Sequence, residues 1–113
     1  MKNNNAGSEE PRQIALKSIA GLDKTIHEPG RLAIMSFLFV VDEADFIFLL
    51  DQTGLTRGNL SSHMSKLEKA GYVEVDKMFI KKIPRTTYHL SEPGRQAYLA
   101  YRSQLLESIQ EFH

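Results

Sequence analysis

The sequence contains no cysteine among its 113 residues. A chain without cysteine can form no disulfide, no thiolate metal site and no thiol nucleophile. Long apolar runs are also missing, because the longest stretch, residues 33–41, is interrupted by Ser36 and is far too short to span a bilayer. Residues 1–11 are rich in Asn, Gly and Glu and do not resemble a signal peptide. We therefore expect a cytoplasmic protein with no membrane partner.

Motifs for catalysis and metal binding are absent as well. The four histidines have no HxxH, HxH or HExxH spacing, so no metal site is expected. The acidic cluster Asp42, Glu43 and Asp45 has no nearby His or nucleophile signature, and we interpret it as a solvated turn that caps a helix. No Gly-rich phosphate loop and no GxSxG motif occurs. The sequence therefore predicts neither an enzyme nor a bound cofactor.

The net charge is zero, but the charges are unevenly distributed. Residues 55–95 carry a net charge of +4, whereas residues 1–54 carry −3 and residues 96–113 carry −1. A basic central segment with acidic flanks can direct one face of a domain toward phosphates. An imbalance of this size also arises by chance, so charge alone does not assign a function.

Length and hydrophobic periodicity predict one domain over residues 11–113, preceded by a disordered tail over residues 1–10. Helices are expected at residues 12–26, 29–41, 46–52 and 57–70. Gly21 weakens the first helix, and Pro29 fits the first turn of the second. Asp45 and Thr56 are candidate N-caps of the third and fourth helices, and Gly54 is the expected stop between them.

The helix expected at residues 57–70 has a narrow apolar seam formed by Leu60, Met64 and Leu67. Its opposite side is small, polar and basic, and carries Gly58, Ser62, Ser65, Lys66 and Lys69. Such a helix buries one edge and presents the rest to solvent or to a partner.

Beyond Gly71 the pattern becomes extended. Residues 72–76 alternate with period two, and residues 85–90 are β-branched and aromatic, so both segments are expected to be strands. The basic stretch between them, residues 78–84, is expected to be the hairpin loop. Ser91 is the candidate cap of a last helix that runs to about Phe112.

This order of elements predicts a mainly α protein with a small β-hairpin (α+β). Two helices joined by a tight turn, the second with a polar outer face, have the layout of a helix-turn-helix, and a hairpin that follows makes it the winged variant. An α-helix fits the major groove of B-DNA, where hydroxyls and amides bond to base edges. Basic side chains on the hairpin would meet phosphates.

The runs GNLSSHMSKLEKAGYV and PRTTYHLSEPGR resemble winged-helix transcription regulators of the MarR/ArsR kind, most closely the compact MarR-like group. The resemblance extends over about residues 22–106. It implies that residues 57–70 form the recognition helix and that residues 77–85 form the wing. It also implies a homodimer whose N- and C-terminal helices form the interface, with half-sites about one helical turn apart on a pseudo-palindromic operator.

The expected contacts with double-stranded DNA come from the recognition helix and the wing. They are Thr56, Arg57, Asn59, Ser61, Ser62, His63, Lys66, Lys81, Lys82, Arg85 and Thr87. His63 borders the apolar seam, so it is equally compatible with a core-edge histidine bonded within the domain. Arg85 matches the arginine that the resemblance places at or near the wing tip. Ile80 and Ile83 depart from a fully polar wing, so part of it is compatible with packing on the domain or on a partner.

The last helix carries apolar residues on a face too wide for one small domain to cover. Heptad spacing of these residues and the apolar stripe of residues 12–26 predict a dimer interface. It comprises Ile14, Ile19, Leu22, Tyr98, Tyr101, Leu105, Ile109 and Phe112. The alternative is that the last helix packs only on its own core.

The sequence therefore favours a homodimeric, sequence-specific DNA-binding regulator. A small-molecule effector, if one exists, is expected near Tyr98 and Tyr101, in a cleft between the dimer helices and the DNA-binding lobe. One rival is a winged-helix protein-interaction module without specific DNA binding, because the fold would be identical. A further rival is a small-molecule sensor that has lost DNA binding.

Overall fold

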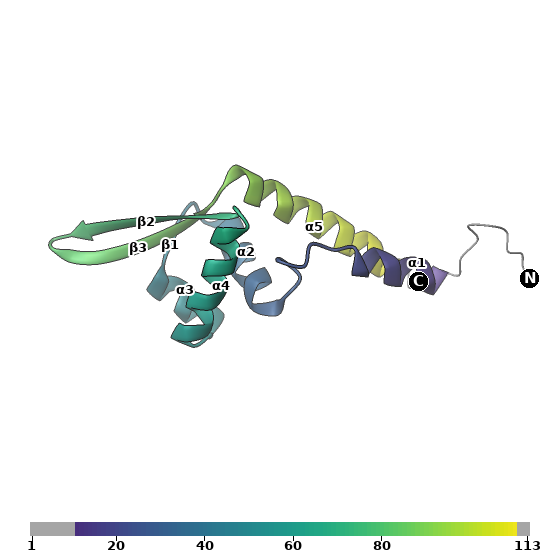
Figure 1. Ribbon diagram of the computed structural model, residues 1–113, viewed down its shortest axis with the longest axis horizontal. Helices are drawn as coiled ribbons and strands as arrows, with labels where there is room; N and C mark the ends of the chain where they lie inside the picture. The colour runs from purple at the N-terminus through teal and green to yellow at the C-terminus, as the bar shows by residue number, and fades with distance from the viewer. Residues whose placement is uncertain (1–10, 111–113) are drawn as a thin grey trace, which may run out of the picture.

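A computed structural model describes residues 11–110 of the chain. Its elements follow in the order α1 (Pro11–Ala20), α2 (Pro29–Val40), β1 (Ala44–Asp45), α3 (Phe46–Thr53), α4 (Arg57–Lys69), β2 (Val73–Ile80), β3 (Ile83–Leu90) and α5 (Glu92–Gln110). Helices α2, α3 and α4 form one lobe (Figure 1). The β2–β3 hairpin projects from one end of this lobe, and α1 and α5 lie side by side at the other. The expected fold class is confirmed.

Local capping sets the angle at which α3 meets α4. The Asp45 carboxylate accepts a hydrogen bond from the backbone N–H of Phe48 at 2.8 Å, and the Thr56 hydroxyl accepts one from the N–H of Asn59 at 3.1 Å. Gly54 ends α3 with a φ of 70°, a left-handed conformation that glycine adopts without steric cost. Both predicted N-caps and the predicted stop are confirmed, and together they produce the short turn of a helix-turn-helix.

The core is a single apolar cluster between the helices and the start of the hairpin. The predicted seam of α4 is confirmed, because Leu60, Met64 and Leu67 are each no more than 3% exposed. Side chains with almost no exposed surface come from every layer: Ile26, Ile34, Met35, Leu38, Leu49, Leu60, Leu67 and Val73. Burial of this seam orients α4, so its opposite side is directed outward.

The sheet has three antiparallel strands in the order β1-β3-β2. Pairing in the hairpin runs from Val73 opposite Leu90 to Ile80 opposite Ile83, so only Lys81 and Lys82 form the turn. The expectation of a loop over residues 78–84 is therefore wrong. A two-residue turn with positive φ at both positions matches the twist of the strands and lets pairing continue to the tip.

The first helix also differs from the expectation of residues 12–26. It ends at Ala20, and the N–H of Gly21 bonds back to the carbonyls of Lys17 and Ser18. The Asp23 carboxylate then accepts the N–H groups of Thr25 and Ile26, which holds residues 21–28 in a turn. This turn lets Leu22 and Ile26 reach the core from a loop.

Ser91 fixes α5 to the base of the hairpin. Its hydroxyl donates to the carbonyl of Gly71 and accepts from the N–H of Gly94, which confirms the predicted cap. Its own N–H donates to the carbonyl of Tyr72 at 3.0 Å. The start of α5 is thus tied to the end of α4 and the start of β2. The expected end of this helix near Phe112, and the expected tail at residues 1–10, lie outside the described residues.

Candidate nucleic-acid interface

The side of α4 opposite its apolar seam forms an exposed polar surface. Its exposed residues, with the preceding cap, are Thr56, Arg57, Gly58, Asn59, Ser61, Ser62, Ser65, Lys66 and Lys69, and the exposed Glu68 lies at its edge. A helix of 13 residues is about 20 Å long, and a major groove about 12 Å wide accepts it. Most of the side chains near its start are small, so the backbone can approach a partner closely. This surface can offer hydroxyl, amide and guanidinium groups to base edges and phosphates.

The start of α4 holds several of the predicted DNA contacts in one place. The Thr56 hydroxyl oxygen accepts from Asn59, which leaves its own O–H free to donate outward. The Arg57 guanidinium lies 6.0 Å from the centre of the Phe46 ring, so α3 helps to position it. The N-terminus of a helix also carries a partial positive charge that favours a phosphate.

His63 points into the domain instead of outward. Its Nδ1 lies 3.1 Å from Nη1 of Arg31, and its Nε2 lies 3.7 Å from a carboxylate oxygen of Glu28. Its side chain is only 16% exposed. Of the two interpretations of this residue, the structure favours the histidine bonded within the domain. Its contacts join α4 to the start of α2.

The tip of the wing is cationic and conformationally strained. Lys81 and Lys82 are exposed and have φ values of 52° and 69°. Both values lie in the left-handed region, where a residue with a side chain costs about 1–2 kcal/mol. Turns of this type usually carry Asn-Gly, which adopts the conformation more readily. Two lysines at these positions therefore place charge at the tip at the expense of stability.

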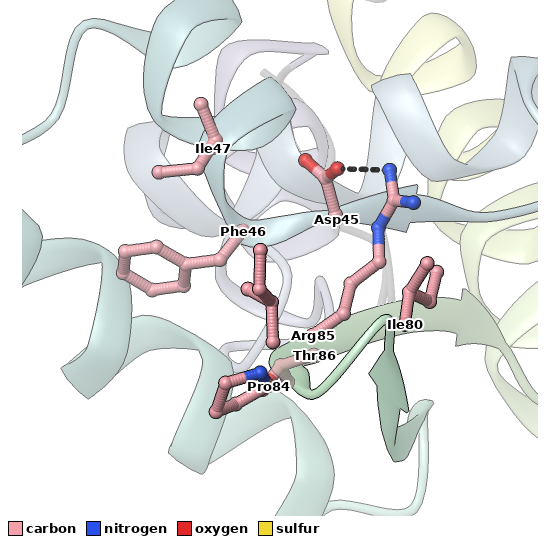
Figure 2. Close-up of a pocket in the computed structure, with 8 residues that line it drawn as sticks. Asp45, Phe46, Ile47, Ile80, Pro84, Arg85 and Thr86 are labelled. Carbon is pink, nitrogen blue, oxygen red and sulfur yellow. Dashed lines mark hydrogen bonds and ion pairs between the residues drawn. The ribbon is translucent and has the colours of Figure 1, made fainter.

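Arg85 lies near the tip of the wing, three residues after the turn. It lies opposite Met78 in the hairpin, and its Nη2 is 2.8 Å from Oδ2 of Asp45 (Figure 2). A hydrogen bond from the N–H of Phe48 and this guanidinium together lower the pKa of Asp45. Arg85 therefore ties the wing to the cap of α3. Strand pairing continues to Ile80 and Ile83, so the turn lies beyond this anchor. About half of its side chain is still exposed.

Thr87, also predicted to contact DNA, is 7% exposed and lies opposite Asp45 in the pairing of β1 with β3. Its hydroxyl has no hydrogen-bond partner among the described residues. The structure therefore removes Thr87 from the exposed surface, because the short strand β1 covers the middle of the hairpin.

An apolar cleft of about 540 Å³ separates the start of α3 from the wing (Figure 2). Phe46 and Ile47 form one wall, Ile80 and Ile83 belong to the wing side, and the Asp45–Arg85 pair borders it. Ile80 and Ile83 are 42% and 66% exposed. The wing isoleucines thus remain largely accessible within the protomer.

The residues predicted to form a dimer interface do not share one surface. Leu22 and Tyr101 are each 3% exposed and belong to the core of the chain itself. The Tyr101 hydroxyl lies 2.7 Å from Nδ1 of His27, and burial raises its pKa. Tyr98 is half-buried, and its hydroxyl bonds to that of Ser36 at 2.9 Å. Both tyrosine hydroxyls near the expected effector cleft are therefore already bonded within the chain.

The remaining residues predicted to form the dimer interface differ in how far they are buried. Ile19 and Leu105 are half-buried against the core, whereas Ile109 is 46% exposed. The side chain of Ile14 and the whole of Phe112 fall outside the described part of the chain. Two exposed leucines were not in the predicted set: Leu16 on α1 and Leu106 on α5, which are 67% and 55% exposed. The seven-residue spacing of Leu99 and Leu106 in the sequence could have indicated Leu106 as an interface residue.

Among residues 11–110, no group of three His, Asp or Glu side chains is arranged to hold a metal ion. Over the same residues, no helix is both long and apolar enough to cross a membrane.

Comparison with known proteins agrees with this geometry. Residues 31–109 match a family described as the winged helix DNA-binding domain. An uncharacterised protein of Methanocaldococcus jannaschii is 34% identical over 84 residues, which cover 74% of this chain and 91% of that protein. The matched family is a DNA-binding family and not an enzyme family.

Two solved structures are similar over most of their length. A transcriptional regulator homologue from Pyrococcus horikoshii OT3 has 32% identity and a TM-score of 0.79, with 88% of this chain and 97% of that chain covered. A protein assigned as a MarR-family transcriptional regulator, from Enterococcus faecalis V583, has 26% identity and a TM-score of 0.62, with 97% and 94% covered. The predicted resemblance to winged-helix transcription regulators is confirmed.

The strain at the wing tip gives a stability prediction. Replacing the turn by Lys81→Asn plus Lys82→Gly should raise the free energy of unfolding by about 1 kcal/mol, because Asn-Gly adopts the two left-handed conformations at lower cost. Urea denaturation measures the change. Lys81→Gln plus Lys82→Gln is the matched control, since it removes the same charges without easing the backbone. Equal stability of the two variants would show that the turn is unstrained.

Proposed function

Because the chain belongs to the winged helix DNA-binding domain family, we propose that it is a transcription regulator that recognises a specific sequence of double-stranded DNA. The observation that carries this proposal is the exposed polar side of α4, which stands beside a hairpin with two lysines at its tip. A helix held from behind by a buried apolar seam presents its outer face rigidly. Rigid presentation reduces the entropy lost on binding.

In this proposal α4 enters the major groove and its first half contacts base edges. Asn59 offers the amide pair that bonds to N6 and N7 of adenine, and Ser62 offers a hydroxyl that suits several bases. Arg57 can bond to guanine or to a phosphate at the mouth of the groove. Gly58 lies between these side chains, and a Cβ added to it would meet no atom within 4 Å, so the backbone there is open to a close partner.

The lysines supply affinity that does not depend on sequence. Lys66 lies on the exposed side of α4, and Lys81 and Lys82 lie at the end of the wing, where they would meet the backbone or the minor groove. Each phosphate that a cation neutralises releases counterions, so binding should weaken steeply as salt rises. Arg85 is anchored to Asp45 at the start of α3 and would hold the wing in place more than extend its reach.

We further propose that the protein acts as a homodimer through α1 and α5. Leu16, Leu106 and Ile109 are exposed apolar side chains on these helices, at the end of the molecule away from the wing (Figure 1). Two-fold pairing there would place two copies of α4 on the same side of a duplex. Half-sites about 34 Å apart would then form a pseudo-palindrome. An effector that alters the separation of the two helices would weaken simultaneous binding.

One observation favours a second candidate function, a protein-interaction module. Phe79, Ile80 and Ile83 are exposed around the wing tip, and the apolar cleft beside α3 is continuous with two of them. A partner protein could cover this surface with little change in charge. The two functions differ in salt dependence, because an apolar protein interface releases no condensed counterions.

Fluorescence anisotropy tests DNA recognition directly. We expect the protein to bind duplex DNA from the region upstream of its own gene more tightly than random duplex. Asn59→Ala plus Ser62→Ala should reduce specific affinity by about 10- to 100-fold, since each good base contact contributes about 1–3 kcal/mol. Gln96→Ala plus Ser103→Ala removes the same kinds of group from exposed positions on α5 and should bind like the wild type. Weak binding whose affinity depends neither on the DNA sequence nor on the Asn59/Ser62 substitutions would favour the protein-interaction module.

Sedimentation velocity tests the dimer. We expect the wild type to sediment as a dimer and Leu106→Glu plus Ile109→Glu to sediment as a folded monomer, because two carboxylates would be desolvated at the interface. Gln96→Glu plus Ala100→Glu adds the same charge to α5 without removing a large exposed apolar side chain, and should stay dimeric. A monomeric wild type, or a dimeric Leu106/Ile109 variant, contradicts an interface on this helix.

A further inference from the structure

A second concave surface lies between the α1–α2 connection and the C-terminal half of α4. It encloses about 400 Å³ and is lined by Lys24, Thr25, Arg31, Lys66, Lys69 and Ala70. Four of these six residues are cations and none is an acid. The connection lies on the side of α4 away from the wing (Figure 1). We call this surface the basic cleft.

Two carboxylates of the adjoining α1–α2 connection, Asp23 and Glu28, are already occupied by other groups. Asp23 accepts the N–H groups of Thr25 and Ile26 with one oxygen and the Tyr72 hydroxyl with the other. Glu28 accepts the N–H of Arg31 as the cap of α2, and this hydrogen bond lowers its pKa. These acids shape the turn, and neither of them pairs with a lysine of the cleft.

The three lysines of the cleft, Lys24, Lys66 and Lys69, are exposed and form no ion pair with any residue between 11 and 110. Like charges held together without counter-charges repel one another, which costs stability unless an anion binds. The cleft therefore has an excess of positive charge that the protomer itself does not neutralise.

Arg31 is held in position at the wall of this cleft. Its Nε donates to the carbonyl of Thr25, and Nη1 lies 3.1 Å from Nδ1 of His63. Nη2 makes no hydrogen bond to the described residues, so its N–H groups remain able to donate. A guanidinium fixed in this way loses little entropy on binding, and its planar donors match a phosphate.

We propose that the basic cleft binds a phosphate of the DNA backbone at the edge of the major groove opposite the wing. The inference rests on the proposed function, and it adds Lys24, Arg31 and Lys69 to the residues expected to contact DNA. Lys66 connects the two surfaces, because it lies both on the exposed side of α4 and in the cleft. The recognition helix is then held by phosphates on both of its sides, which fixes its depth and tilt in the groove.

His63 has a specific part in this arrangement. It lies on α4 but bonds to Arg31, so it joins the recognition helix to the cleft through one hydrogen bond. His63 is a positioning residue for Arg31, and it does not itself contact DNA. This role explains why a histidine on the recognition helix is mostly buried.

The salt dependence of DNA binding tests the cleft. The slope of log K against log salt becomes shallower by about 0.9 for each phosphate that the protein no longer neutralises. We expect Lys24→Gln plus Lys69→Gln to make the slope shallower by about 1 to 2, while the ratio of specific to random binding changes less than twofold. Lys24→Arg plus Lys69→Arg keeps both cations in the cleft and should leave the slope unchanged.

The outcomes separate failure of the cleft from failure of the proposed function. Specific, salt-dependent binding with an unchanged slope in the Lys24/Lys69 variant would contradict the phosphate contact at the basic cleft. It would leave the proposed DNA-binding function standing. Wild-type protein that binds no duplex would overturn both. Thermal stabilisation by millimolar inorganic phosphate that the Lys24/Lys69 variant loses, without any effect of that variant on DNA binding, would assign the cleft to a small anion and overturn the backbone contact.

Discussion

The burial of one edge of α4 is the interaction on which the rest of the structure depends. Leu60, Met64 and Leu67 pack into a core that α2, α3 and the base of the hairpin complete. Because that packing fixes the rotation of the helix about its own axis, every other side chain of α4 has a fixed direction. The caps at Asp45 and Thr56 fix the angle of approach, and Ser91 fixes the direction in which α5 leaves the hairpin. A polar surface presented by a rigid helix is a consequence of these constraints.

The wing depends on the same lobe through a different set of contacts. The Asp45–Arg85 pair joins it to the cap of α3, so one carboxylate both starts a helix and anchors a hairpin. Beyond that anchor the hairpin carries exposed apolar side chains and ends in two lysines with strained backbone conformations. Such a tip is costly for an isolated protomer, and backbone strain of this kind is often retained where a segment meets a ligand. The basic cleft opposes the wing across α4, so positive charge flanks the helix on both sides.

Local features of the sequence predicted much of this fold. The caps at Asp45, Thr56 and Ser91 and the seam of α4 each depend on residues within one or two turns, so their spacing was sufficient. Features that depend on distant segments were not predictable in the same way. Residues 78–84 were expected to form a loop, because Lys81-Lys82 carries no Gly or Asn signal for a two-residue turn. In the structure only these two residues turn, and the others continue the strands. Leu22 and Tyr101 look like interface residues by periodicity, but both are buried in the core: the turn after α1 brings Leu22 there, and the Tyr101 hydroxyl bonds to His27 of the same turn. The basic cleft joins residues 24 and 69, and no periodic pattern connects them.

Methylation interference on a bound duplex tests most directly whether α4 occupies the major groove. Dimethyl sulfate marks N7 of guanine in the major groove and N3 of adenine in the minor groove, so it separates contacts of the helix from contacts of the wing. We expect interference at guanine N7 in two patches about one helical turn apart, with adenine N3 interference only outside them. Binding that persists with no interference at guanine N7 would contradict recognition by α4.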